Sequence, residues 1–369
     1  MPISAFKIRA RRIAKNAKSR LAFTLVEVMA AASIMVILIG AVLYSVGDVL
    51  NAWNSSAGKI QGYTEADSLA DFIKQDFESI IIKRDGKAWL QVSYPVNVGQ
   101  LVGESVGSLP MRPPQIMFFS QAYIRPRFDS AQLMNKSTKR TSIPGSICAV
   151  KYQLSYKSPF RSGGGNEGSG MKQPGAFYGL YRAVIDSKST FEGALGAAQG
   201  DTENNEYALQ RFWNGTCTIL NDEGVYERDV DLKSWAVSPE NFIASNLVDF
   251  QVTFAIMYKK EGMVSEGESQ YSVAYVEPGT EFTVADKIYV KGRLYERGSG
   301  GGKANVSPKE VENGFLAFAE VSMTFVSDAG ALEIKNLSGE DKLNRFKDLR
   351  QQYGTTITRK ISFVSEPLD

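Results

Sequence analysis

The chain has 369 residues, of which 43% are hydrophobic and 11% aromatic, and this composition excludes an intrinsically disordered protein. Residues 1–22 hold seven basic and no acidic residues, so 35 basic and 40 acidic residues remain after residue 22. An acidic remainder does not suit a nucleic-acid-binding surface, and the absence of histidine removes the commonest catalytic arrangements and zinc ligands. We therefore expect no enzymatic activity, no cofactor, no metal and no nucleic-acid partner.

An apolar segment, residues 23–46, follows the basic stretch directly. About 20 helical residues cross the ~30 Å hydrocarbon core of a bilayer, so this segment is long enough to span one. The positive-inside rule places residues 1–22 in the cytoplasm and exports everything after Val46. An ordinary signal anchor and a cleaved secretory signal peptide are the more general interpretations of this pattern.

Glu27, the fifth residue of the apolar segment, is unusual at such a position. An ionised carboxylate inside a membrane span costs roughly 2.5–3.5 kcal/mol at the centre, and less near an end. One interpretation is that Glu27 lies at the membrane interface, where the helix dipole stabilises it. Another requires a cut before Phe23, because the freed α-amine would then supply a cation for Glu27 of the same or a neighbouring subunit.

The string Ala22-Phe-Thr-Leu-Val-Glu-Val28 resembles the cleavage and methylation motif of type IV prepilins and of the pseudopilins of type II secretion. The resemblance implies that a prepilin peptidase cuts between Ala22 and Phe23, methylates the new amine, and leaves Glu27 at mature position five to guide assembly. The family usually has Gly before the cut, where this chain has Ala22. The resemblance covers about the first 46 residues. It further implies other pilin or pseudopilin subunits and an inner-membrane assembly platform as partners.

An apolar stripe at helical spacing continues beyond Val46 and predicts an amphipathic helix packed on a globular domain. The stripe consists of Leu69, Phe72, Ile73, Phe77, Ile80 and Ile81. We expect a helix over residues 23–84, kinked or broken at its glycines, since Gly costs about 1 kcal/mol in a helix interior. The end of this segment is similar to the first helix of the larger, J-like minor pseudopilins.

From about residue 87 the sequence consists of short runs of β-branched and aromatic residues separated by Gly, Pro, Asn and Ser. This pattern predicts strands and turns. Expected strands are 89–94, 115–120, 147–156, 177–185, 247–258, 315–326 and 357–364. Their order also resembles that of J-like pseudopilins. The Gly-rich stretches 162–170 and 298–303 lack the spacing of a phosphate loop and predict hairpin loops.

The two cysteines, Cys148 and Cys217, lie on the side that we expect to be exported, where a disulfide between them is conceivable. Two buried thiols are the alternative. The acidic stretches 201–206 and 221–224 do not match a calcium loop, and solvated loop charge is the better interpretation.

The expected organisation is therefore a basic leader (1–22), an N-terminal helix (23–84, with its transmembrane part at 23–46) and a β-rich exported head (85–369). This is an α+β, pilin-like architecture. The resemblance implies a structural subunit of a type IV pilus-like or type II secretion filament in the inner membrane, and the large head suggests a minor, tip-located one. The competing hypothesis is a membrane-anchored exported binding protein, adhesin or enzyme that uses the helix only as an anchor.

Overall fold

The computed structural model describes residues 24–94, 113–121, 147–157, 177–185, 187, 190–195, 208–220, 226–260, 269–298, 302–337 and 342–363. The chain divides into two units, residues 1–57 and 58–369. The fold is α+β, with an apolar N-terminal helix followed by a domain rich in β-sheet. The boundary between the units falls inside the helix, so the head unit includes the C-terminal part of that helix.

Helix α2 runs from Leu25 to Glu78, 54 residues, without interruption at any of its four glycines. Of the two alternatives that were expected, a kink or a break, the break was therefore wrong, and the kink stays a prediction. Glycine costs a helix about 1 kcal/mol per residue, but its backbone still donates and accepts the helical hydrogen bonds, and cooperative propagation from both sides maintains the helix. The helix ends before the expected residue 84, because Ser79 begins a turn and Ile80 forms a β-bridge with Ser120.

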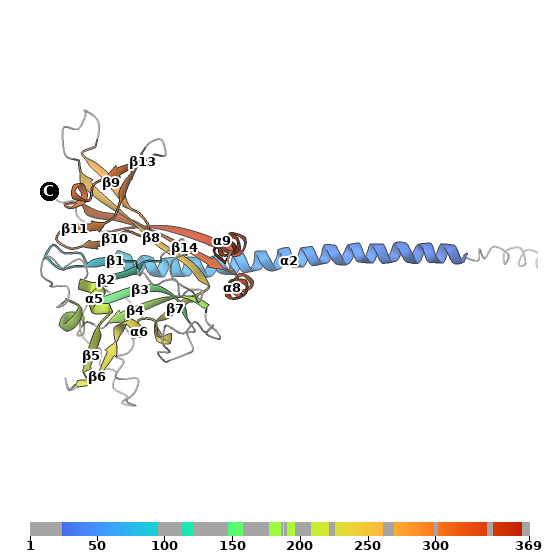
Figure 1. Cartoon of the computed structure of the whole chain (residues 1–369), viewed down its shortest axis with the longest axis horizontal. Helices are drawn as coiled ribbons and strands as arrows, with labels where there is room; N and C mark the ends of the chain where they lie inside the picture. Colours follow the sequence, from blue (N-terminus) through green and yellow to red (C-terminus); the bar gives the residue numbers. More distant parts are fainter. Residues whose placement is uncertain are drawn as a thin grey trace, which may run out of the picture. The chain divides into compact units, whose positions relative to one another are not determined.

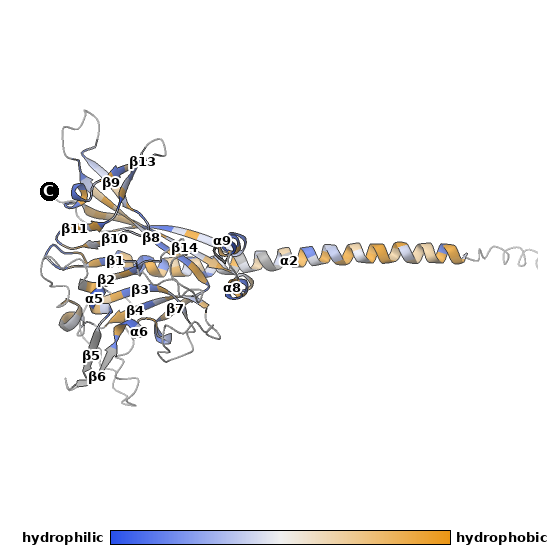
Figure 2. Ribbon diagram, in the orientation of Figure 1, coloured by the Kyte–Doolittle hydropathy of each residue, from blue (hydrophilic) through white to orange (hydrophobic). Residues whose placement is uncertain are grey.

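The first unit presents its apolar side chains outward. Residues 25–50 form a helical segment that is long and apolar enough to cross a membrane, and none of its side chains is buried. Figure 2 shows this part of α2 as the most continuously hydrophobic stretch of the helix. Exposure of so much apolar surface to water is energetically costly.

Two antiparallel sheets build the head unit (Figure 1). The seven-stranded sheet has the order β11-β10-β1-β2-β3-β4-β7 and the six-stranded sheet the order β13-β12-β9-β8-β14-β15. The first comprises β1 (Leu90–Ser93), β2 (Gln115–Ser120), β3 (Cys148–Lys157), β4 (Phe177–Ile185), β7 (Phe242–Ser245), β10 (Glu281–Val284) and β11 (Ile288–Lys291). The second comprises β8 (Leu247–Lys259), β9 (Tyr271–Val276), β12 (Leu294–Arg297), β13 (Lys303–Val306), β14 (Phe315–Val326) and β15 (Gly354–Ser362).

Short helices and one hairpin complete the described part of the head. Strands β5 (Thr216–Leu220) and β6 (Tyr226–Asp231) pair with each other. The helical segments are η2 (Thr190–Ala194), α5 (Ala208–Trp213), α6 (Leu232–Trp235), η4 (Pro239–Asn241), α7 (Pro308–Val311), α8 (Asp328–Lys335) and α9 (Lys342–Tyr353).

All seven expected strands are present. Strands β2, β4 and β14 begin and end at the predicted residues, and β1, β3, β8 and β15 overlap their predictions. Strands β12 and β13 pair as a hairpin, as predicted there, and the backbone N–H of Gly298 donates to the carbonyl of Gly302 at 2.9 Å, while residues 299–301 between them lie outside the described residues. The other Gly-rich stretch, 162–170, lies outside the described residues.

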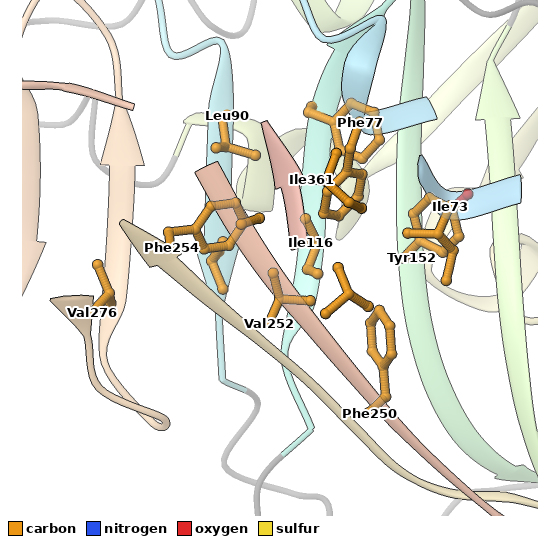
Figure 3. Packing of buried hydrophobic residues seen from close by; sticks show 14 of the residues in the cluster. Ile73, Phe77, Leu90, Ile116, Tyr152, Phe250, Val252, Phe254, Val276 and Ile361 are labelled. Carbon is orange, nitrogen blue, oxygen red and sulfur yellow. The ribbon is translucent and has the colours of Figure 1, made fainter. Parts of the chain in front are cut away.

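The main core of the head forms where the end of α2 meets both sheets. Ile73 and Phe77 are fully buried, and the ring of Phe77 lies 5.4 Å from that of Phe118 on β2 and 6.4 Å from that of Phe254 on β8. Figure 3 shows Ile73 and Phe77 of α2 among Tyr152 and Ile361, from β3 and β15. The predicted apolar stripe is thus confirmed as the face on which the head packs.

A second cluster covers the opposite face of the seven-stranded sheet, which we call the α5/α6 face. It contains Met117, Ala149 and Ala183 from the sheet, and Trp213 and Leu232 from α5 and α6. A third cluster packs α8 and α9 onto Tyr178 and Val326. The seven-stranded sheet therefore has protein on both of its faces.

Candidate functional site

The start of α2 is held by a reciprocal pair of side chains. The carboxylate of Glu27 accepts a hydrogen bond from the backbone N–H of Thr24 at 2.9 Å and another from its hydroxyl at 3.1 Å. The hydroxyl of Thr24 in turn accepts from the backbone N–H of Glu27 at 3.3 Å. This is a capping box, which satisfies N–H groups that the first turn of a helix otherwise leaves unpaired.

The capping box gives Glu27 a local role in addition to the predicted one. Its side chain is exposed and lies at the positive end of the helix dipole, as the interfacial interpretation requires. Ala22 and Phe23, the predicted processing residues, lie outside the described residues. The pairing of Glu27 with an amine on Phe23 therefore stays a prediction. The Thr-Leu-Val-Glu spacing is a sequence signature of a capping box that the sequence reasoning missed.

A second group of functional side chains lies at the other end of α2, inside the head. The carboxylate of Asp76 accepts hydrogen bonds from Arg182 Nε at 2.6 Å and Nη2 at 2.9 Å. The hydroxyl of Tyr152 donates to the same carboxylate at 2.6 Å. Asp76 is 4% exposed and Arg182 9%, and the guanidinium also lies 4.9 Å from the ring centre of Phe72.

The surroundings of this group determine its electrostatics. Burial raises the pKa of the Tyr152 hydroxyl well above its usual value, and the charge of Asp76 adds to the effect. Burial by itself lowers the pKa of Arg182, but the hydrogen bond to Asp76 and the charges around it outweigh burial, so that the net shift is upward. Both carboxylate oxygens accept from protein donors, so the arrangement fixes α2 against β3 and β4. It is a structural clamp, which we call the Asp76 clamp.

A further ion pair supports the same helix from the six-stranded sheet. Arg359 on β15 donates to the carboxylate of Asp67 on α2. Both side chains are about 40% exposed, so this pair is more strongly screened by solvent than the Asp76 clamp.

The structure does not decide between a Cys148–Cys217 disulfide and two buried thiols. Cys148 is buried on β3, and its Sγ lies 3.8 Å from the hydroxyl of Ser187. Cys217 belongs to β5, but its side chain lies outside the described part of the chain. The same holds for the acidic stretches 201–206 and 221–224. Among the described residues, no three His, Cys, Asp or Glu side chains are grouped in a way that would hold a metal ion.

Comparisons of the chain with models of protein families, with curated proteins and with solved structures give no match. The residues of this chain and their geometry are therefore the basis for a proposed function.

Proposed function

We propose that this chain is a structural subunit of a type IV pilus-like or type II secretion filament, cut by a prepilin peptidase before Phe23 and methylated on the new amine. The observation that carries the proposal is the exposed apolar helical segment from Leu25 to Leu50, which in the sequence follows a basic stretch and overlaps the string Phe23-Thr-Leu-Val-Glu27. The resemblance of this string to the prepilin motif supplies the reaction, and the helix supplies the surface for assembly.

The geometry at the helix start is compatible with a role for Glu27 in assembly. Its carboxylate reaches the backbone N–H of Thr24, the residue next to Phe23. A cut before Phe23 would therefore create a cation one residue away from the group that Glu27 already contacts. Pairing of the carboxylate with this amine, in the same or a neighbouring subunit, would lower the cost of a charge inside an apolar assembly.

The exposed apolar surface of residues 25–50 suits the helix both to a membrane, before assembly, and to contact with other helices, after assembly. Before assembly it would lie in the inner membrane as a single span, with the basic leader in the cytoplasm and the head exported. After assembly it would pack against the helices of other subunits, where close contact replaces lipid. The size of the head favours a minor, tip-located subunit of the J-like kind. The partners would be the peptidase, other subunits, the assembly platform and membrane lipid.

The first test is the N-terminal sequence and mass of the protein from membranes of cells with and without an active prepilin peptidase. We expect a start at methylated Phe23 only where the peptidase is active. An intact N-terminus in both cells would instead indicate an ordinary anchor, and cleavage beyond Val46 a secretory signal. Either outcome would favour the competing hypothesis of an exported binding protein, adhesin or enzyme.

The second test separates the charge of Glu27 from its capping role. Gln at the same position of a capping box can still accept from the N-cap backbone, whereas Leu cannot. We expect Glu27→Gln and Glu27→Leu both to insert into the membrane and both to lose filament incorporation, measured by shearing and immunoblotting. Asp48→Asn, at another exposed acid of α2, is the matched control and should assemble normally. Normal assembly of Glu27→Gln would rule out the charge-pairing role.

A further inference from the structure

In the part of the chain that the structure describes, the α5/α6 face of the seven-stranded sheet contains buried polar side-chain atoms without a hydrogen-bond partner. Five such side-chain atoms have no hydrogen bond within the described part of the chain: Lys151 Nζ, Gln153 Oε1, Tyr181 OH, Trp213 Nε1 and Trp235 Nε1. Folded proteins leave only a few buried polar atoms unpaired, and each one calls for a physical explanation. Finding several together points to a bound group that is not part of the polypeptide.

The five side chains share one side of the sheet. Lys151 and Gln153 are two residues apart on β3 and thus point to the same face. Gln153 is the register partner of Tyr181 on β4, and Lys151 is the partner of Ala183, which belongs to the cluster under α5 and α6. Trp213 comes from α5, and Trp235, at the end of α6, packs against the same cluster.

Lys151 is the group whose burial is hardest to explain. Its side chain is 1% exposed, and its ammonium lies 5.8 Å from the ring centre of Trp213, a weak substitute for a carboxylate. Burial lowers the pKa of Lys151 to about 8, and the positive charge of Lys233 lowers it further, against a smaller opposing effect of Asp231. At neutral pH the residue is still mostly an ammonium, and among the described residues only the ring of Trp213 and the smaller effect of Asp231 offset the hydration that it loses on burial.

The chemistry of the five groups selects the kind of ligand. An ammonium offers three donors, each indole N–H is a donor only, and a tyrosine hydroxyl can donate. The amide oxygen of Gln153 is the one atom among the five that can only accept. A group with several acceptor oxygens and a negative charge would satisfy the donors and neutralise Lys151 together.

We propose that the α5/α6 face binds an oxyanion, a carboxylate or a phosphate, with Lys151 as its cationic partner and the indole N–H groups of Trp213 and Trp235 as donors. This site lies in the head and is independent of the proposed assembly function, which depends on residues 22–50.

The experiment uses the full chain in detergent micelles, titrated with sodium acetate or sodium phosphate at constant ionic strength in sodium chloride. Binding is followed by tryptophan fluorescence, because two of the four tryptophans lie at the site, and by the midpoint of thermal unfolding. We expect a saturable fluorescence change and a rise in the midpoint with one anion or both. A response to acetate alone identifies a carboxylate site, and a response to phosphate alone a phosphate site.

Lys151→Met should weaken the apparent affinity at least tenfold, whereas Lys233→Met, at the neighbouring exposed lysine of α6, should change it less than threefold. Trp213→Phe retains the aromatic ring and removes one donor, so it tests the site even if Lys151→Met does not fold. We expect it to weaken binding about three- to tenfold. No saturable response in the wild type, or an equal response in Lys151→Met and Trp213→Phe, would overturn the proposal.

Discussion

The two faces of the seven-stranded sheet bury a cation in opposite ways. Arg182 on β4 faces α2, where the carboxylate of Asp76 and the hydroxyl of Tyr152 complete its surroundings. Lys151 on β3, next to Tyr152 in the chain, faces α5 and meets the ring of Trp213. Both cations are at most 9% exposed, so burial alone does not distinguish them. Among the described residues, the first face thus supplies its buried cation with a carboxylate and a hydroxyl, and the second supplies Lys151 with no hydrogen-bond acceptor.

The largest effect should come from removing the carboxylate of the Asp76 clamp. Asp76→Ala leaves Arg182 as a buried charge without its partner, and breaking such pairs costs about 3–5 kcal/mol. Urea unfolding followed by tryptophan fluorescence measures the loss in the free energy of unfolding. Asp71→Ala, at an exposed acid of the same helix, is the control and should change it little. A loss below about 1 kcal/mol for Asp76→Ala would mean that water enters and hydrates Arg182.

Lys151→Met should change the free energy of unfolding in the direction opposite to Asp76→Ala. In a buffer without phosphate or carboxylates, we expect the free energy of unfolding to increase by about 1–4 kcal/mol at pH 7, because an apolar side chain of similar length replaces an uncompensated buried charge. The same urea unfolding measures it. A decrease would show that Lys151 has a stabilising partner within the chain itself.

The stability difference between Lys151→Met and wild type should also depend on pH. Lys151 has a pKa of about 8 in the folded chain and near its usual 10.5 when unfolded, so the unfolded state holds more protons between these values. The destabilising contribution of Lys151 is therefore complete below pH 8 and diminishes as the pH rises. Between pH 7 and 9.5, the stability difference between Lys151→Met and wild type should shrink. A constant difference would mean that burial does not shift the pKa of Lys151.

The smallest effect on the free energy of unfolding is expected for a substitution at Glu78, two residues after Asp76. Glu78 forms an ion pair with Lys74 one helical turn earlier at 3.8 Å, and both side chains are about half exposed. Exposed pairs of this kind contribute roughly 0.3–0.5 kcal/mol. Glu78→Gln should therefore change the free energy of unfolding by less than about 0.5 kcal/mol and lose even this at high salt. A larger loss would indicate that the pair is shielded from solvent.

The sequence predicts those parts of the fold whose signal is local. The long strands β2, β4 and β14 are recognisable from runs of β-branched and aromatic residues. The four-residue strands β10 to β13 are too short for a pattern. Strand β10 pairs with the distant β1 and β12 pairs with β9, whereas the edge strands β11 and β13 pair with β10 and β12, their neighbours in the chain. Helices α8 and α9 were not expected either, since the segment before β15 is rich in charge and carries few apolar residues.

The candidate sites follow the same rule. Glu27 was recognisable because a carboxylate interrupts an apolar run, and its capping partner is only three residues away. The Asp76 clamp joins residues 106 positions apart, and nothing near Arg182 in the sequence marks it as buried. The Lys151 site is harder still to predict from the sequence. It is identified by side-chain atoms that lack partners in the described fold, and this lack is visible only once the fold is known.

The pairing of β1 with β10 bears on how the head forms. Residues 90–92 find their partners at 282–284, and Phe77 of α2 packs against Phe363 near the end of the chain. Such distant contacts give a high contact order, for which folding is slow because long loops must close before the contacts stabilise anything. The core around Phe77 thus cannot be complete before the last strand is available. A nascent head would therefore keep apolar surface exposed at least until Phe363 has been synthesised, and exposed apolar surface of this kind makes folding intermediates prone to aggregate.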